Sequence, residues 1–155
     1  MTVEINQPIP AFAAEATSGL SITSDSLTGH YSVLYFYPKD STPGCTTESQ
    51  DFSALHGEFL ALNCQIFGVS RDSLKSHENF KAKYAMPFEL ISDPDETLCE
   101  LFSVMQLKNM YGKQVRGVER STFLLGPDGV LLAVWRKVKV PGHAAEVLET
   151  LKASL

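Results

Sequence analysis

The stretch SVLYFYPKDSTPGCT, residues 32 to 46, decides the fold class. Its first half, SVLYFYP, is an apolar and aromatic run that ends at a proline, which is typical of a strand buried in the centre of a sheet. Its second half is a Thr-Pro-Gly turn followed by Cys45. Beyond the turn, apolar residues recur at three- and four-residue spacing and predict a helix over residues 45 to 62: Phe52, Leu55, Phe59 and Leu62.

The rest of the chain continues this alternation of strand and helix. CQIFGVS and FELIS predict two more strands, residues 73 to 84 predict a helix, and Asp93 as cap with Pro94 in the first turn predicts another. The turns TSG and GPDG predict one hairpin near the N-terminus and one within STFLLGPDGVLLAVW. A last helix buries four residues, Ala144, Val147, Leu148 and Leu151. Since such alternation favours parallel strands, we expect an α/β fold of the thioredoxin-like kind, with three layers (α/β/α), a mixed central sheet and an N-terminal hairpin.

Length and composition limit the class of protein. A chain of 155 residues suits a single domain, residues 1–155, and 44% apolar residues can form an ordinary core. A net charge of -5 and a pI near 5.3 argue against nucleic-acid binding, which needs a basic surface. The N-terminus lacks the pattern of a signal peptide, and no apolar run approaches the roughly 20 residues that span a bilayer. We therefore expect a cytoplasmic chain with no nucleic-acid or membrane partner.

The three cysteines indicate thiol chemistry rather than a disulfide scaffold. Their number is odd and their spacing fits no framework, so we expect Cys45, Cys64 and Cys99 to be free thiols. The four histidines, His30, His56, His77 and His143, show no metal-ligand spacing with the cysteines, and we expect them at the surface or at the flanks of the helices. The sequence predicts no metal site and no cofactor.

Cys45 stands where a thiolate is favoured. If residues 32–38 form a strand and residues 45–62 a helix, Cys45 lies in the first helical turn, beside free amide groups and the positive end of the helix dipole. Pro43 rigidifies the turn, Gly44 lets a small substrate approach the backbone, and Thr42 offers a hydroxyl that donates and accepts hydrogen bonds. Fast chemistry also needs a cation near the leaving oxygen, which must come from elsewhere in the chain.

The segment PKDSTPGCT, residues 38 to 46, resembles the active-site motif of the peroxiredoxins: a proline, three residues, a threonine, two residues and a cysteine. Its neighbours YFY and T, and the segments FGVSRDS, LISDPDETLCELF and NMYGKQVRGVERSTFLLGPDG, are most similar to the bacterioferritin-comigratory protein, or peroxiredoxin Q, subfamily. The similarity covers nearly the whole chain. It implies a thioredoxin-like fold and a peroxidase without metal or flavin.

The resemblance also implies roles for individual residues. Cys45 corresponds to the peroxidatic cysteine, Thr42 to the hydroxyl that holds the peroxide, and Pro43 to the residue that shields the thiolate. Arg120 corresponds to the active-site arginine, with Arg116, expected in the preceding loop, as the competing choice. Attack of the Cys45 thiolate on the O–O bond would give water or an alcohol and a sulfenic acid at Cys45.

Glu48 lies one helical turn after Cys45, where its charge would oppose a thiolate unless it is paired. One interpretation is that Glu48 orients Arg120; the other is a solvated glutamate in the first helical turn.

The chain departs from its subfamily at the resolving cysteine. The two positions where relatives carry that residue hold Gln50 and Lys81 here. The sequence therefore favours a one-cysteine enzyme, expected to be a monomer, whose sulfenic acid is attacked by an external thiol such as thioredoxin, a glutaredoxin or glutathione. Alternatives are an internal bridge to Cys64 or Cys99, which would need local unfolding, and a peroxide sensor that does not turn over. A thiol–disulfide oxidoreductase is disfavoured because residue 48 is not a cysteine.

Overall fold

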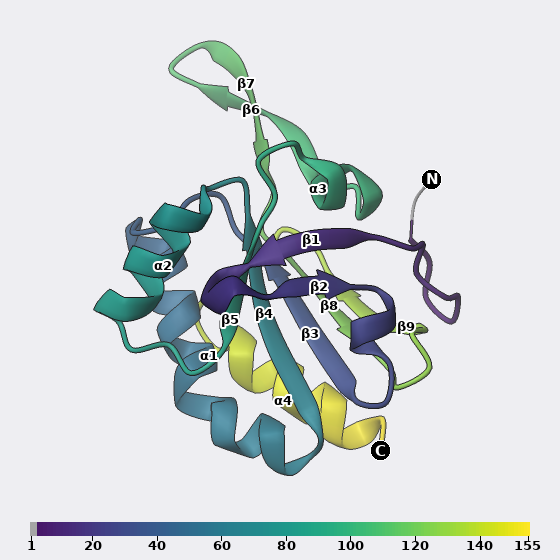
Figure 1. The fold of residues 1–155 in the computed structure, drawn as a ribbon. Helices are drawn as coiled ribbons and strands as arrows, with labels where there is room; N and C mark the ends of the chain where they lie inside the picture. The colour runs from purple at the N-terminus through teal and green to yellow at the C-terminus, as the bar shows by residue number, and fades with distance from the viewer. Residues whose placement is uncertain (1–2) are drawn as a thin grey trace.

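The fold is built on a seven-stranded mixed sheet in the order β2-β1-β5-β4-β3-β8-β9 (Figure 1). The computed structural model describes residues 3–155, with the side chain of Met110 left out. The three central strands, β3 (Tyr31–Phe36), β4 (Cys64–Ser70) and β5 (Glu89–Ser92), are parallel, as the alternation of strand and helix predicts. Their carboxyl ends therefore meet at one edge of the sheet, which is where open α/β sheets bind ligands.

The two predicted hairpins extend this parallel centre on either side. β1 (Ala13–Ala16) and β2 (Ser21–Thr23) are antiparallel and join the sheet beside β5, connected through the short helix η1 (Thr17–Gly19). A second short helix, η2 (Asp25–Leu27), follows β2. β8 (Ser121–Leu125) and β9 (Leu131–Trp135) join beside β3. The predicted mixed sheet and N-terminal hairpin are confirmed.

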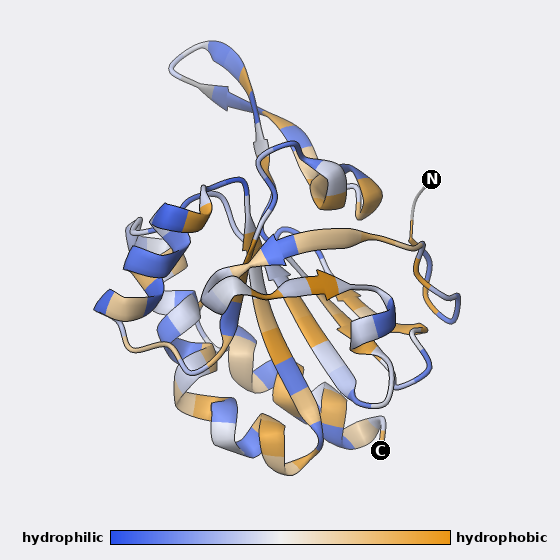
Figure 2. Ribbon diagram, viewed as in Figure 1, coloured by the Kyte–Doolittle hydropathy of each residue, from blue (hydrophilic) through white to orange (hydrophobic). Residues whose placement is uncertain are grey.

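Helices cover both faces of the sheet. The sheet and α1 (Pro43–Ala61), α2 (Leu74–Lys83) and α4 (His143–Ala153) share one apolar cluster, which includes Phe52, Phe80 and Leu151. The short helix α3 (Thr97–Leu101) contributes to a second cluster, which contains Phe36 and Phe123. Figure 2 shows the apolar central strands, while much of α2 is hydrophilic. Among the described residues, no helix is both long and apolar enough to cross a membrane.

The structure contains one hairpin that the sequence did not predict. β6 (Met105–Met110) and β7 (Lys113–Val118) form a separate two-stranded hairpin that projects away from the central sheet near α3 (Figure 1). Arg116, predicted in a loop, therefore lies in a strand and pairs with Leu107. Its guanidinium binds Glu96 and Glu100, which ties the hairpin to the α3 region.

The start of α3 also differs from the prediction. Asp93 is not the N-cap: the helix begins at Thr97, and the capping position is Glu96, with a φ of 62°. The Asp93 carboxylate nevertheless accepts the backbone N–H groups of Leu98 at 3.0 Å and Cys99 at 2.8 Å. The side chain thus satisfies free amides of the first turn from further back in the chain.

Candidate active site

Cys45 lies at the edge of the sheet where the parallel strands end. β3 ends at Phe36, and α1 begins at Pro43 with Thr42 in the capping position, so Cys45 is the third residue of the helix. Proline fits the first helical position because its missing N–H would be unpaired there in any case. Cys45 is only 1% exposed, whereas Pro43 and Gly44 are exposed. The thiol therefore faces inward, beneath the turn that precedes it.

Strand pairing brings Arg120 to the same place. In the antiparallel pair of β3 and β8, Phe36 is opposite Ser121, so Arg120 stands just beyond the carboxyl end of β3. Its Nη2 lies 3.3 Å from Cys45 Sγ, and its Nη1 donates to Glu48 Oε1 at 2.6 Å. The structure therefore brings Arg120 to Cys45, whereas Arg116 forms ion pairs with Glu96 and Glu100.

Glu48 is a buried partner of Arg120, not a solvated residue of the first turn. Its side chain is 1% exposed, and the described residues offer no hydrogen-bond partner to Oε2. Burial raises the pKa of Glu48 to about 7, against the opposing effect of the Arg120 charge. Burial alone would lower the pKa of Arg120, but the charges of Glu48 and Cys45 outweigh it and raise that pKa.

Two residues of the turn complete the surroundings of the thiol. The Thr42 hydroxyl donates to the carbonyl oxygen of Lys39 at 2.7 Å, which leaves its own lone pairs to accept a hydrogen bond. Gly44 lies close to Arg120, because a Cβ at this position would come within 3.2 Å of Nη2. Glycine therefore makes room for the guanidinium at the first turn of α1.

The other two cysteines occupy different surroundings. Cys64 opens β4, and burial raises the pKa of its thiol to about 12. Cys99 lies in α3, and burial together with the neighbouring Asp93 raises the pKa of its thiol strongly. Both are fully buried, so neither presents a ready thiolate.

The sequence predicted all four histidines at the surface or at the flanks of the helices, but two of them are buried. His77 is 0% exposed and His143 is 5% exposed. His143 Nε2 lies 2.8 Å from Thr122 Oγ1, and burial lowers the pKa of His143. His77 contacts Asp40, a residue between β3 and α1 that no sequence pattern had singled out.

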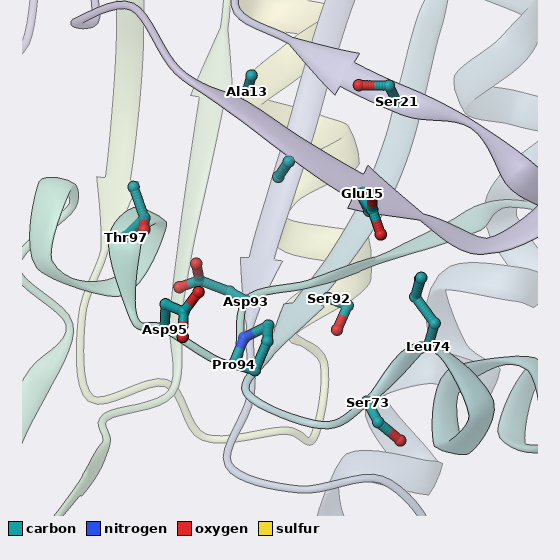
Figure 3. A pocket seen from close by; sticks show the side chains of 11 residues that line it. Ala13, Glu15, Ser21, Ser73, Leu74, Ser92, Asp93, Pro94, Asp95 and Thr97 are labelled. Carbon is teal, nitrogen blue, oxygen red and sulfur yellow. The ribbon is translucent and has the colours of Figure 1, made fainter.

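A hollow of about 470 Å³ lies away from these residues, between β1, the carboxyl end of β5 and the start of α2 (Figure 3). The inner polar side chains of its wall have partners: Ser73 caps α2, Ser92 donates to the Asp72 carbonyl oxygen, and Asp93 binds the first turn of α3. Neither Cys45 nor Arg120 lines it. The candidate site is therefore the one around Cys45.

The fold and this arrangement define a class of protein. A thioredoxin-like sheet holds a buried thiol at the first turn of a helix, in contact with an arginine that is itself fixed by a carboxylate. Such an arrangement places a cation beside the reacting sulfur, which is what a thiol-based peroxidase requires.

Comparison with known proteins agrees with that class. Residues 5–134 match the AhpC/TSA family. The chain is 59% identical over 137 residues to peroxiredoxin Bcp of Xanthomonas campestris pv. campestris, covering 88% of this chain and 86% of the relative. It is 48% identical over 152 residues to peroxiredoxin Bcp of Bacillus subtilis, covering 98% and 97%.

Solved structures of such relatives also superpose closely on this chain. The Xanthomonas campestris bacterioferritin comigratory protein, described for its alkyl peroxide reduction activity, superposes with a TM-score of 0.89 at 56% identity, over 92% of this chain and 91% of the other. A mutant of Xylella fastidiosa PrxQ superposes with a TM-score of 0.94 at 44% identity, over 99% and 98%. The chain belongs to the AhpC/TSA family and, within it, to the Bcp/peroxiredoxin Q peroxiredoxins, and it is a peroxidase that uses a peroxide and a thiol reductant.

Proposed function

We propose that Cys45 is the residue that reduces hydroperoxides, organic ones included, and that an external thiol regenerates it. The observation that carries this proposal is the contact of 3.3 Å between Cys45 Sγ and Arg120 Nη2 at the first turn of α1. The alkyl peroxide activity described for the Xanthomonas relative supports the choice of organic hydroperoxides as substrates.

The chemistry follows from the neighbours of the sulfur. The Cys45 thiolate attacks one oxygen of the peroxide, so an S–O bond forms while the O–O bond breaks. The leaving oxygen departs as an alkoxide or hydroxide and takes a proton to become an alcohol or water, and Cys45 becomes a sulfenic acid. Arg120 faces both the thiolate and the charge that develops on oxygen, which is where a fixed cation accelerates such a step.

Thr42, Pro43 and Gly44 hold and enclose the peroxide in this proposal. Since the Thr42 hydroxyl already donates to Lys39, it is ready to accept the O–H of a hydroperoxide. Pro43 covers the buried sulfur, and Gly44 leaves space for the Arg120 guanidinium. Glu48 fixes the guanidinium from its other side.

Regeneration by an external thiol is supported by where the other cysteines lie. Cys64 pairs with Tyr31 at the amino end of β3, whereas α1 begins beyond its carboxyl end, and a strand of six residues spans about 17 Å. Cys99 belongs to the apolar cluster on the other face of the sheet. A disulfide needs Cα atoms within about 7 Å, so neither cysteine reaches Cys45 in this fold.

The positions where relatives carry a resolving cysteine do not offer a thiol. Gln50 is exposed on α1, and Lys81 on α2 donates to Ser18 Oγ at 3.0 Å and also binds Glu89. In our proposal, a first external thiol attacks the Cys45 sulfenic acid and releases water, forming a mixed disulfide. A second thiol then restores Cys45 and leaves with the first as a disulfide.

The test is steady-state consumption of tert-butyl hydroperoxide with glutathione plus glutaredoxin, or with thioredoxin, as reductant. We expect a double variant, Cys64→Ser with Cys99→Ser, to keep turning over at a rate within about threefold of the wild type. A folded double variant that consumes only one equivalent of peroxide would overturn the external-thiol proposal.

A further inference from the structure

Asp40 is a buried carboxylate in the segment that joins β3 to α1. It is 6% exposed and receives three hydrogen-bonding side chains. The Tyr37 hydroxyl donates to Oδ1 at 2.6 Å, the Ser76 hydroxyl donates to Oδ2 at 2.8 Å, and His77 Nδ1 lies 2.7 Å from Oδ2. Two of these partners, Ser76 and His77, belong to α2. Asp40 therefore ties the segment before Cys45 to a different helix.

Both ring nitrogens of His77 are used. Nε2 lies 2.9 Å from the carbonyl oxygen of Ile91 at the end of β5, and a carbonyl oxygen only accepts, so Nε2 carries a proton. Nδ1 and Asp40 Oδ2 share a further proton between them. The imidazole thus forms a fixed bridge from β5 to the Asp40 carboxylate, fully shielded from water.

A metal site is the other interpretation of these side chains. Asp40, Asp72 and His77 each offer a ligand atom, and the three atoms lie within 4.8 Å of one another. Hydrogen bonds already account for all of them, because Asp72 Oδ2 accepts the Asp40 N–H at 3.0 Å and the Ser70 hydroxyl at 2.5 Å. The cluster is satisfied without an ion.

The bridge acts on the turn that leads to Cys45. The side chain of Asp40 is held by α2 and its backbone N–H by Asp72. The Thr42 hydroxyl donates to the Lys39 carbonyl oxygen, and this hydrogen bond closes the segment of residues 39–42 around Asp40. Four residues lie between Asp40 and Cys45, and one of them, Thr42, is the N-cap residue of the helix that carries the thiol.

We propose that His77 is a positioning residue for the peroxidase reaction. Through Asp40 it fixes the turn of residues 37–42, and with it the placement of the Thr42 hydroxyl and Cys45 Sγ relative to Arg120. The inference rests on the proposed role of Cys45. His77 itself touches neither the sulfur nor the peroxide. A displacement of the order of 1 Å at a reacting group is enough to slow a reaction by about 100-fold.

Two substitutions separate the two hydrogen bonds of His77. The amide nitrogen of Asn lies where Nδ1 lies in His, so His77→Asn keeps a donor to Asp40 and loses the bond to Ile91. The amide nitrogen of Gln lies where Nε2 lies, so His77→Gln keeps the bond to Ile91 and loses the bond to Asp40. We expect His77→Gln to lower the second-order rate constant for oxidation of Cys45 by tert-butyl hydroperoxide at least tenfold. We expect His77→Asn to stay within about threefold of the wild type.

Alkylation by iodoacetamide is the readout that separates positioning from a general change at the thiol. It needs a thiolate but no aligned O–O bond, so we expect it to change less than threefold in both variants. Equal peroxide rates in all three folded proteins would overturn the inference. So would equal losses in both variants, or a loss of alkylation that matches the loss of peroxide reaction.

Controls keep the test interpretable. Lys81→Met removes a contact at the other end of α2 and should leave the oxidation rate unchanged. Urea unfolding establishes that each variant is folded during the measurement. If the His77 variants do not fold, Ser76→Ala removes one donor to Asp40 from a partly exposed position, and we expect a loss of about threefold; an unchanged rate would overturn the inference. If wild-type Cys45 is not oxidised at all, the proposed function fails instead.

Discussion

The first turns of α1 and α3 make a natural comparison within one molecule. Cys45 is the third residue of α1 and Cys99 is the third residue of α3, and both are almost completely buried, at 1% and 0% exposure. Cys45 faces the guanidinium of Arg120. Cys99 faces the carboxylate of Asp93, which also takes the N–H groups of Leu98 and Cys99.

The difference shows what selects a reactive cysteine in this chain. Burial and position on the helix are shared, so neither can distinguish the two thiols. Burial opposes a thiolate, and a neighbouring carboxylate opposes it further, whereas a neighbouring cation favours it. At α3 the pKa of Cys99 is raised by burial and then by Asp93. The cation in contact with Cys45 is therefore the feature that sets it apart from Cys99.

Removing each thiol in turn should give the largest difference in peroxidase activity between the two sites. We expect Cys45→Ser to abolish peroxide consumption, a loss of more than about 1,000-fold, since it removes the sulfur that Arg120 contacts. Cys99→Ser and Cys64→Ser should each keep most of the activity in a coupled peroxidase assay. An inactive but folded Cys99→Ser variant would contradict the assignment.

Arg120 tests the role of charge directly. We expect Arg120→Met to slow oxidation of Cys45 by about 100- to 1,000-fold, because it removes the cation and leaves Glu48 buried without its partner. Arg120→Lys keeps the charge but offers one nitrogen in place of the two that bind Glu48 and the sulfur, so an intermediate loss is expected. Stopped-flow or quenched-flow oxidation measures both.

Arg116→Met is the matched control for Arg120. Arg116 pairs with Glu96 and Glu100, outside the site, so its loss should leave the rate unchanged. If the two methionine variants lost activity equally, Arg120 would have no special role.

Glu48 should give the stability of the protein a recognisable pH dependence. Its pKa is raised from 4.5 to about 7 in the folded chain, so between these values the folded chain holds more protons than the unfolded chain. Stability therefore falls as pH rises through this window, by about 3 kcal/mol at most. Glu48→Gln removes that slope.

The measurement is urea unfolding of wild type and Glu48→Gln at pH 5, 6, 7 and 8. We expect the wild type to lose stability relative to the variant as the pH rises. Parallel curves would show that Glu48 does not change protonation in this range.

Gly44 should have a smaller effect. A Cβ at residue 44 would lie 3.2 Å from Arg120 Nη2, so the guanidinium must shift by a few tenths of an ångström in Gly44→Ala. We expect peroxide oxidation to slow by about three- to tenfold. Gly57→Ala, on the same helix with no atom within 4 Å of the added Cβ, should keep full activity. It should also gain about 0.5–1 kcal/mol of stability. Equal rates for the two alanine variants would show that Gly44 does not need to be small.

The smallest effect is expected at the first turn of α3, on the alkylation rate of Cys99. Asp93→Asn removes the carboxylate beside Cys99 but leaves it buried, so the thiol should remain nearly inert to iodoacetamide in the folded protein. Mass spectrometry after limited alkylation measures this. Rapid labelling of Cys99 in a fully folded variant would show that Asp93, rather than burial, keeps this thiol unreactive.

The sequence predicted the parts of this comparison that depend on local pattern. Apolar runs located the central strands, and the motif around Cys45 located the first turn of α1. The resemblance to the peroxiredoxins pointed to Arg120. The β6–β7 hairpin was missed because its strands are largely polar. A usable signal was present in the two-residue loop at Tyr111 and Gly112, whose φ values of 54° and 78° suit such a turn.

Asp40 and His77 mark the limit of sequence reasoning here. Asp40 reads as an ordinary polar residue of a turn, and His77 falls in the apolar stripe of a helix. Their contact joins residues 37 positions apart and depends on how α2 packs against the sheet edge. Neither spacing nor composition contains that information. The Glu48–Arg120 pair, in contrast, was open to prediction because a charge one turn from a thiolate needs a partner.

The most direct test is the intact mass of the protein after one equivalent of hydrogen peroxide in the presence of a sulfenic-acid trap, followed by peptide mapping. If the neighbouring charge selects Cys45 and resolution is external, one trap adduct appears on Cys45, and Cys64 and Cys99 remain free thiols. Loss of two hydrogens without an adduct would mean an internal disulfide and would contradict resolution by an external thiol. An adduct on Cys99 or Cys64, or no reaction at all, would contradict the claim that Arg120 selects the reactive sulfur.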